Sequence, residues 1–217
     1  MNLNCIDKIE LGIQTVYLLK FEPFDIHDFF QYLTEQEIER VLSFKSIKRQ
    51  QEFVATRKLR HDIFGFNHIH YNEVGAPYIK NEGYISISHA DGIVGIAMNK
   101  KYEVSLDLET VSNQSLRLRD KFLSEQEKKR LNTNCEIEMT KAWSLKEVLY
   151  KLSGAKGIIF KEQLRIQKLS DEQWLGEIFI KGKKIEVELS TFVLGNVVLS
   201  CNSGKKLFLD GGLQYNI

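Results

Sequence analysis

The spacing of apolar residues alternates between a helical repeat and a two-residue repeat, and the alternation occurs twice along the chain. A helical segment over 46–64 precedes three runs with strand-like alternation, at 84–89, 92–98 and 102–109. Helical spacing returns at 124–131 and 136–153, and strand patterns return from Trp174 onward. Two rounds of helices and strands predict an α+β fold rather than regular βαβ alternation.

Local signals refine this prediction near the N-terminus. Residues 13–19 read as a first strand, and a helix is expected to begin near Thr34, because Thr34 and Glu37 have capping-box spacing. The chain has 217 residues but only two prolines, with no low-complexity stretch or linker. Any two halves of the molecule must therefore pack closely.

Composition excludes several classes of protein. No apolar run reaches the roughly 18 residues of a membrane span, and the first residues lack the apolar stretch of a secretory signal. We therefore expect a cytoplasmic protein without a membrane association. The three cysteines, Cys5, Cys135 and Cys201, are far apart and odd in number, so neither a disulfide framework nor a zinc site is indicated.

Charge is balanced, with 30 basic and 29 acidic residues. A protein that binds nucleic acid through bulk charge is disfavoured, although a local basic patch could hold a small anion. Basic residues are dense between Arg40 and Arg60, and Arg49, Arg57 and Arg60 share one stripe of the expected helix. A solvated helix face is the default interpretation. A phosphate site is the more specific interpretation, since clustered arginines contact phosphate bidentately.

Two acidic side chains lie on one face of the expected strand over 103–109. Alternation places Asp107 and Glu109 together, opposite Leu106 and Leu108. Carboxylates so placed repel each other, and a divalent cation between them would turn that repulsion into attraction. A solvated strand face would need no cation, and from spacing alone this simpler interpretation is favoured.

The helix over 136–153 carries Trp143, Glu147 and Lys151 four residues apart. Glu147 and Lys151 can form a surface ion pair worth about 0.3–0.5 kcal/mol. Trp143, however, indicates that this face is covered, either by the rest of the protein or by a ligand. Ser88 and His89 end a strand before a glycine turn, where they can bind phosphate or be satisfied by local hydrogen bonds.

Five short motifs follow one another along the chain: Glu39-Arg40, Gly75-Ala76-Pro77, Ile87-Ser88-His89, Ser105-Leu106-Asp107-Leu108-Glu109 and Trp143-Ser144-Leu145-Lys146-Glu147-Val148-Leu149-Tyr150-Lys151. In order and spacing, they resemble the 4'-phosphopantetheinyl transferases, specifically the two-lobed type similar to the surfactin synthetase activator. The resemblance covers about residues 39–157. It departs from the family pattern at Ala76, where the family has lysine, and at Ser105, where it has glycine.

The resemblance implies a pseudo-dimer of two similar α+β lobes with the active site in the cleft between them. Residues 1–105 would form the lobe that contacts the phosphates of coenzyme A, and residues 106–217 the lobe with the metal and catalytic residues. The implied activity is transfer of 4'-phosphopantetheine from coenzyme A to a serine of an apo acyl or peptidyl carrier protein, with release of 3',5'-ADP. The enzyme would work as a monomer, without nucleic acid.

Individual roles also follow from the resemblance. Asp107, Glu109 and Glu147 would hold Mg²⁺, a hard cation that prefers oxygen ligands, and Glu147 would be the general base. Lys151 would stabilise the leaving group. The residues expected to grip the coenzyme are Arg40, Arg49, Ser88 and His89.

Two other classes stay open. One is a different magnesium-dependent phosphoryl-transfer enzyme that uses the same carboxylates on water. The other is a non-catalytic module that binds coenzyme A or a carrier protein, made conceivable by Ala76 and Ser105. The apolar residues Ile158, Ile159 and Phe160 are expected either to dock a carrier protein or to belong to the core.

Overall fold

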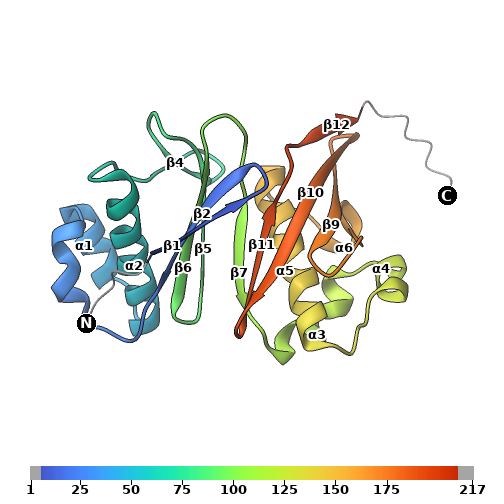
Figure 1. Cartoon of the computed structure of the whole chain (residues 1–217), viewed down its shortest axis with the longest axis horizontal. Helices are drawn as coiled ribbons and strands as arrows, with labels where there is room; N and C mark the ends of the chain where they lie inside the picture. Colours follow the sequence, from blue (N-terminus) through green and yellow to red (C-terminus); the bar gives the residue numbers. More distant parts are fainter. Residues whose placement is uncertain (1–5, 210–217) are drawn as a thin grey trace.

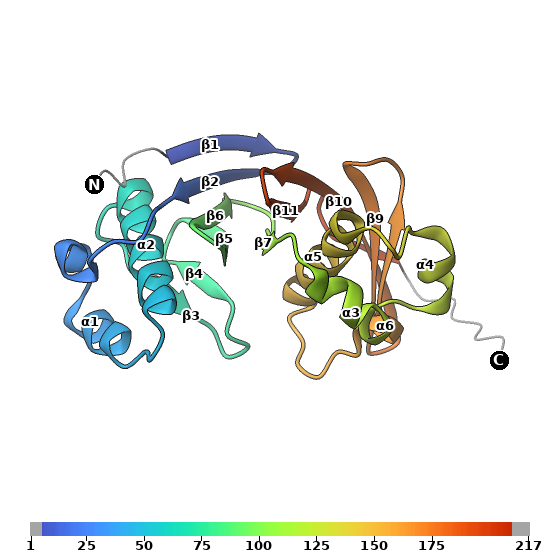
Figure 2. The same cartoon turned by 90° about the horizontal axis from the view of Figure 1, so that it is seen from below.

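The computed structural model describes residues 6–209 and contains two six-stranded antiparallel sheets, each covered by helices (Figures 1 and 2). The first sheet has the order β1-β2-β6-β5-β4-β3 and the second the order β7-β11-β10-β9-β8, with β12 paired to β10. This mixed architecture confirms the α+β class. Cys135 and Cys201 are free thiols, and Cys5 lies outside the described residues.

The strands of the first sheet are β1 (Ile6–Leu11), β2 (Gln14–Lys20), β3 (His70–Tyr71), β4 (Pro77–Ile79), β5 (Gly83–Ala90) and β6 (Ile93–Asn99). Those of the second are β7 (Leu106–Thr110), β8 (Leu164–Lys168), β9 (Gln173–Ile180), β10 (Lys183–Leu194), β11 (Val197–Asn202) and β12 (Leu207–Leu209). The helical segments are η1 (Ile26–Tyr32), α1 (Glu35–Leu42), α2 (Ile47–Phe64), α3 (Asn113–Phe122), α4 (Glu125–Arg130), α5 (Glu136–Ser153) and α6 (Phe160–Gln163).

Helix ends follow the capping signals of the sequence. Thr34 caps α1 with the expected capping box, in which the Glu37 amide donates to Thr34 Oγ1 at 3.2 Å and Glu37 Oε2 accepts from the Thr34 amide. Helix α5 ends before Gly154, whose φ of 58° is left-handed. The sequence analysis did not predict β1, α3 and β8. β1 and α3 carry many exposed polar residues, and β8, although it alternates apolar and polar residues, has only five residues.

The arginine stripe of α2 is partly internal. Arg57 and Arg60 are 3% and 1% exposed, and Arg57 Nε donates to Glu37 Oε1 at 2.6 Å. Arg60 donates to the Tyr32 carbonyl at 2.5 Å. These two arginines therefore tie α1 and η1 to α2, and they form neither a solvated face nor a phosphate site.

The two sheets meet along β5 and β7. Strand β4 pairs only with Gly83 and Tyr84, so the rest of β5 lacks a strand on that side. The hydroxyl oxygens of Ser86 and Ser88 on β5 accept hydrogen bonds from the Leu106 and Leu108 amides of β7, both at 3.0 Å. Side-chain hydroxyls thus join β5 to β7 in place of a backbone ladder.

An apolar cluster lies beneath this junction and takes residues from both sheets. It includes Val16, Leu18, Ile93, Leu106, Leu108, Val197 and Leu199. Leu106 and Leu108 point into it, as the alternation of the sequence predicts, which leaves Asp107 on the opposite face of β7. In the part of the chain that the structure describes, no helix is long and apolar enough to cross a membrane.

Candidate active site

Asp107 sits at the centre of a buried polar cluster at the junction of β5, β7 and α5. It is 6% exposed, so the solvated strand face favoured from spacing is wrong. Lys151 Nζ and Ser88 Oγ donate to its Oδ1 at 2.9 and 3.3 Å, and Ser144 Oγ donates to its Oδ2 at 2.8 Å. Donors from β5 and α5 therefore fix the position of this carboxylate.

Lys151 does not pair with Glu147 within residues 6–209. Its ammonium group instead donates to the Leu106 carbonyl at 2.7 Å and to Asp107. Because α5 packs against β7, the lysine meets a strand carboxylate that is better placed than its neighbour one helical turn away. The expected surface ion pair is thus wrong.

Glu147 and Glu109 are repelled by the charge of Asp107, and neither forms an ion pair with a residue of the described part of the chain, although the charge of Lys151 partly offsets the repulsion. Burial raises the pKa of Glu147 to about 7, and Asp107 adds to the rise. Burial likewise raises the pKa of Glu109, again with Asp107, whereas a hydrogen bond from Trp143 opposes the change. The structure therefore brings three carboxylates into electrostatic contact.

The donor set of these carboxylates fits a hard divalent cation. All three side chains offer oxygen only. Burial, and after it the charge of Asp107, raises the pKa of Glu147 and of Glu109, and a cation would offset both effects. Over residues 6–209, no three histidine, cysteine or acidic side chains already form a metal-binding group. The residue types therefore fit Mg²⁺.

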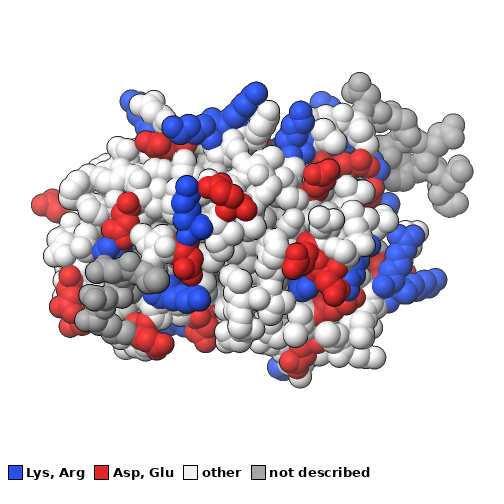
Figure 3. All heavy atoms as spheres, in the orientation of Figure 1, with Lys and Arg blue, Asp and Glu red and all other residues white. Residues whose placement is uncertain are grey.

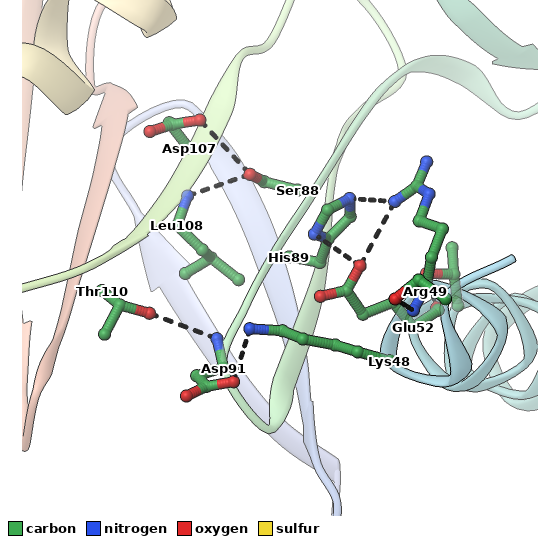
Figure 4. A network of polar contacts seen from close by, with 11 residues as sticks. Lys48, Arg49, Glu52, Ser88, His89, Asp91, Asp107, Leu108 and Thr110 are labelled. Atoms are coloured by element: carbon green, nitrogen blue, oxygen red, sulfur yellow. Dashed lines mark hydrogen bonds and ion pairs between the residues drawn. The ribbon is translucent and has the colours of Figure 1, made fainter.

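His89 and Arg49 meet on the other side of Ser88 (Figure 4). Arg49 Nη1 contacts His89 Nε2 directly. Behind them, Glu52 Oε2 lies 3.3 Å from His89 Nδ1 and 3.4 Å from Arg49 Nη1. Ser88, by contrast, already uses its hydroxyl to donate to Asp107 and to accept from Leu108. Its geometry is that of a residue that positions Asp107.

Arg40 stands apart from this group. It lies on α1, with its guanidinium 5.7 Å from the ring centre of Phe53 and 5.9 Å from that of Tyr71. Tyr71 lines a cavity of about 520 Å³ together with Arg49, His89 and Lys151. Arg40 therefore does not line this cavity but contacts Tyr71, which does.

That cavity continues into a second one of about 710 Å³. The two share Val74, Ala76, Pro77, Ile85, Val104, Lys151 and Gly154, and the second adds Lys80 and Lys206. Three of the four residues expected to grip the coenzyme lie at or beside the first cavity, since Arg49 and His89 line it and Ser88 is next to His89. A concave site lined by cations can hold a phosphorylated ligand.

Three residues of this region were not assigned from the sequence. Ser144 lies inside a recognised motif, but its bond to Asp107 depends on how α5 packs. Glu52 and Lys156 approach the site from α2 and from the loop after α5. A signal existed only for Lys156, which stands in a glycine-flanked loop directly after the motif.

Trp143 is half-buried and packs against aromatic side chains of the protein itself. Its ring centre lies 5.3 Å from Phe122 and 5.5 Å from Phe160. Phe160 and Ile158 are half-buried against the core of the second sheet, whereas Ile159 is 49% exposed. The apolar segment after α5 thus divides between core packing and a single exposed side chain.

Carboxylates beside a cavity lined by lysine, arginine and histidine are an arrangement suited to phosphoryl transfer. Residues 103–201 match the family model of the 4'-phosphopantetheinyl transferase superfamily. The matched segment contains all three carboxylates and Lys151, and it supports this superfamily and, in general terms, phosphopantetheine transfer. No curated protein matches the chain.

Proposed function

We propose that this protein transfers 4'-phosphopantetheine from coenzyme A to a serine of an apo acyl or peptidyl carrier protein, with release of 3',5'-ADP. One observation carries the proposal: Asp107, Glu109, Glu147 and Lys151 lie in the segment that matches the superfamily, next to a cavity lined by Arg49 and His89. The site would lie between two lobes, residues 1–105 and 106–217, of a cytoplasmic monomer.

Binding of the coenzyme would depend on the cations around the cavity. Arg49, His89 and Lys151 line it, and Lys156 adds a further positive charge. Charge-assisted hydrogen bonds from these groups would hold the phosphates. Arg40 would contribute from the rim. Ser88 would act mainly through Asp107, because its hydroxyl is already engaged.

In the reaction, the serine oxygen of the carrier protein forms a bond to the β-phosphorus of coenzyme A. The bond from this phosphorus to the oxygen of the 3',5'-ADP leaving group breaks, and the serine proton passes to Glu147. A carboxylate with a pKa of about 7 suits this role at neutral pH. Lys151 would stabilise the charge that develops on the leaving group.

Asp107, Glu109 and Glu147 would hold Mg²⁺. When bound, this ion would neutralise phosphate charge and polarise the reacting phosphoryl group. A general base must lie within hydrogen-bond reach of the proton that it accepts. Glu147 would therefore have to reach the serine hydroxyl while it also serves as a metal ligand. The metal site therefore requires Asp107 and Glu109 from β7 together with Glu147 from α5.

Mass spectrometry of an apo carrier protein incubated with coenzyme A, Mg²⁺ and this protein tests the proposal. A gain of one phosphopantetheine group on the serine is expected, with 3',5'-ADP formed only when the carrier is present. Asp107→Ala should nearly abolish the gain. Release of 3',5'-ADP without a carrier would indicate a hydrolase, and binding without any turnover would indicate a non-catalytic module.

A further inference from the structure

A buried carboxylate lies directly behind the cations of the cavity (Figure 4). Glu52 is 5% exposed, and its Oε2 is 3.3 Å from His89 Nδ1 and 3.4 Å from Arg49 Nη1. A negative charge at this place works against the binding of any anion, because like charges repel. Its presence therefore calls for a role other than contact with a ligand.

The contacts of the two ring nitrogens of His89 indicate what Glu52 does instead. Nδ1 faces Glu52, and an ionised carboxylate can only accept hydrogen bonds, so the ring hydrogen belongs on Nδ1. Nε2 faces Arg49, whose guanidinium can only donate, so in the neutral ring Nε2 accepts. Contacts on both sides thus fix one tautomer, with Nε2 directed toward Arg49.

We propose that Glu52 is a positioning residue for His89, and that a phosphate group entering between Arg49 and His89 binds together with one proton on Nε2. The inference rests on the proposed function, because the phosphates of coenzyme A are the anion considered. The proton comes from solvent and converts the imidazole to an imidazolium. Nε2 then donates to a phosphate oxygen beside Arg49, while Nδ1 and Glu52 become an ion pair.

The charges that face His89 come from three elements. Burial is the largest cause that lowers the pKa of His89, and Arg49 on α2 and Lys151 on α5 act in the same direction. Glu52 on α2 and Asp107 on β7 oppose them. The ring is therefore neutral in the free protein near pH 7.5. A phosphate dianion offsets the nearby cations and favours the charged ring.

Lys48, one residue before Arg49, forms its ion pair with Asp91, where Nζ lies 2.6 Å from Oδ1 (Figure 4). Its charge also interacts with that of Glu52, but it makes no ion pair with Glu52 in the described part of the chain. Glu52 is accordingly the carboxylate closest to the ring nitrogens in the described part of the chain. Its charge decides how readily His89 accepts the proton.

Calorimetry with 3',5'-ADP as the probe measures the proton directly. Titrations at pH 7.5 in two buffers of different ionisation enthalpy give the number of protons taken up on binding. Phosphate monoesters have a second pKa of about 6, so at pH 7.5 the proton uptake reports on the protein. The wild type is expected to take up most of one proton. Its affinity should fall as the pH rises, by up to about tenfold per pH unit, between the pKa of the ring in the free protein and its pKa in the complex.

Two variants and a control separate the roles. Glu52→Gln keeps the shape and an acceptor for Nδ1 but removes the charge, so proton uptake at pH 7.5 should fall and the affinity profile should move to lower pH. His89→Gln should abolish the uptake. Glu172→Gln makes the same change of charge at an exposed position between β8 and β9, and it should behave like the wild type.

The outcomes distinguish this inference from the proposed function. Binding of 3',5'-ADP by the wild type without proton uptake overturns the inference and leaves the proposed function in place. Unchanged uptake in Glu52→Gln, or uptake that persists in His89→Gln, also overturns it. Failure of the wild type to bind both 3',5'-ADP and coenzyme A would overturn the proposed function as well.

Discussion

Lys151 reaches from α5 to the carboxylate of Asp107 on β7, where Nζ and Oδ1 are 2.9 Å apart. The same ammonium group also donates to the carbonyl of Leu106 at 2.7 Å. This contact links the end of the long helix to the strand that carries two of the three acidic residues. Lys151 therefore neutralises a buried carboxylate and also lines the cavity.

Lys151→Met should lower kcat by about 10²- to 10³-fold, because it removes a charged group next to the leaving group. It should also destabilise the protein, since Asp107 loses its counter-charge. Lys151→Arg keeps the charge and should retain more of both properties. Steady-state kinetics and thermal melts of the two variants provide the measurement. Wild-type kcat in Lys151→Met would remove this residue from the proposed reaction.

Glu147→Gln preserves shape but loses charge and basicity. We expect kcat to fall by about 10²- to 10⁴-fold, with a much smaller change in affinity for coenzyme A. Calorimetry and single-turnover kinetics separate the two effects. If coenzyme binding disappeared together with activity, Glu147 would be chiefly a ligand, and the base would be another group.

The same residue should make stability depend on pH in metal-free protein. The pKa of Glu147 is raised from 4.5 to about 7 on folding, so between these values the folded state binds more protons than the unfolded state. Stability should therefore decrease as pH rises through this window. In EDTA, Glu147→Gln should melt at a higher temperature than the wild type at pH 8, with a smaller difference at pH 4.5. Identical pH profiles would contradict the burial of this carboxylate.

A substitution of Lys146, which lies next to the site, is expected to affect the stability of the protein through its buried contacts. Its Nζ is fully buried and donates to Glu127 Oε2 at 2.8 Å and to the Phe122 and Leu164 carbonyls at 2.6 and 2.9 Å. Lys146→Met should cost about 3–5 kcal/mol in urea unfolding, because Glu127 is left with an unpaired buried charge. Lys129→Met, at an exposed position on α4, is the matched control and should change stability little.

Ala76→Lys tests the main departure from the family pattern. Ala76 is exposed, lines both cavities, and donates its amide hydrogen to Asn72 Oδ1 at 2.9 Å. A lysine there should strengthen the binding of coenzyme A. The gain should be smaller than that of a charge-assisted hydrogen bond, which is about 1.5–3 kcal/mol, because water screens an exposed lysine. Improvement limited to coenzyme A with its 3'-phosphate would place position 76 at that group. No improvement with or without the 3'-phosphate would exclude the turn from the site.

Local signals in the sequence were sufficient to predict the elements that carry the site. The bounds of α5 follow from its apolar stripe and from Gly154, and the two faces of β7 follow from strict alternation. The partner of Lys151 could not be predicted, because Glu147 is nearer in sequence and Asp107 becomes nearer only after α5 packs on β7. The burial of Arg57 could not be predicted for the same reason, because its partner Glu37 lies on another helix.

Glu52 illustrates a second limit. An acidic residue in a basic helix reads as an exposed partner for its neighbours, and Arg49 three residues earlier satisfies that expectation. Its contact with His89 joins α2 to β5 and depends on how the helix is rotated against the first sheet. No periodicity in the sequence encodes that rotation.

The serine hydroxyls between β5 and β7 have a consequence for attempts to divide the chain. A fragment that stops at residue 105 would leave the hydroxyls of Ser86 and Ser88 without their amide donors. It would also expose Val16, Leu18 and Ile93 to water. Two separately expressed fragments should therefore be insoluble alone and regain a folded state only when produced together. A gene split at this point would then report on assembly, because neither product could carry the carboxylates and the histidine at once.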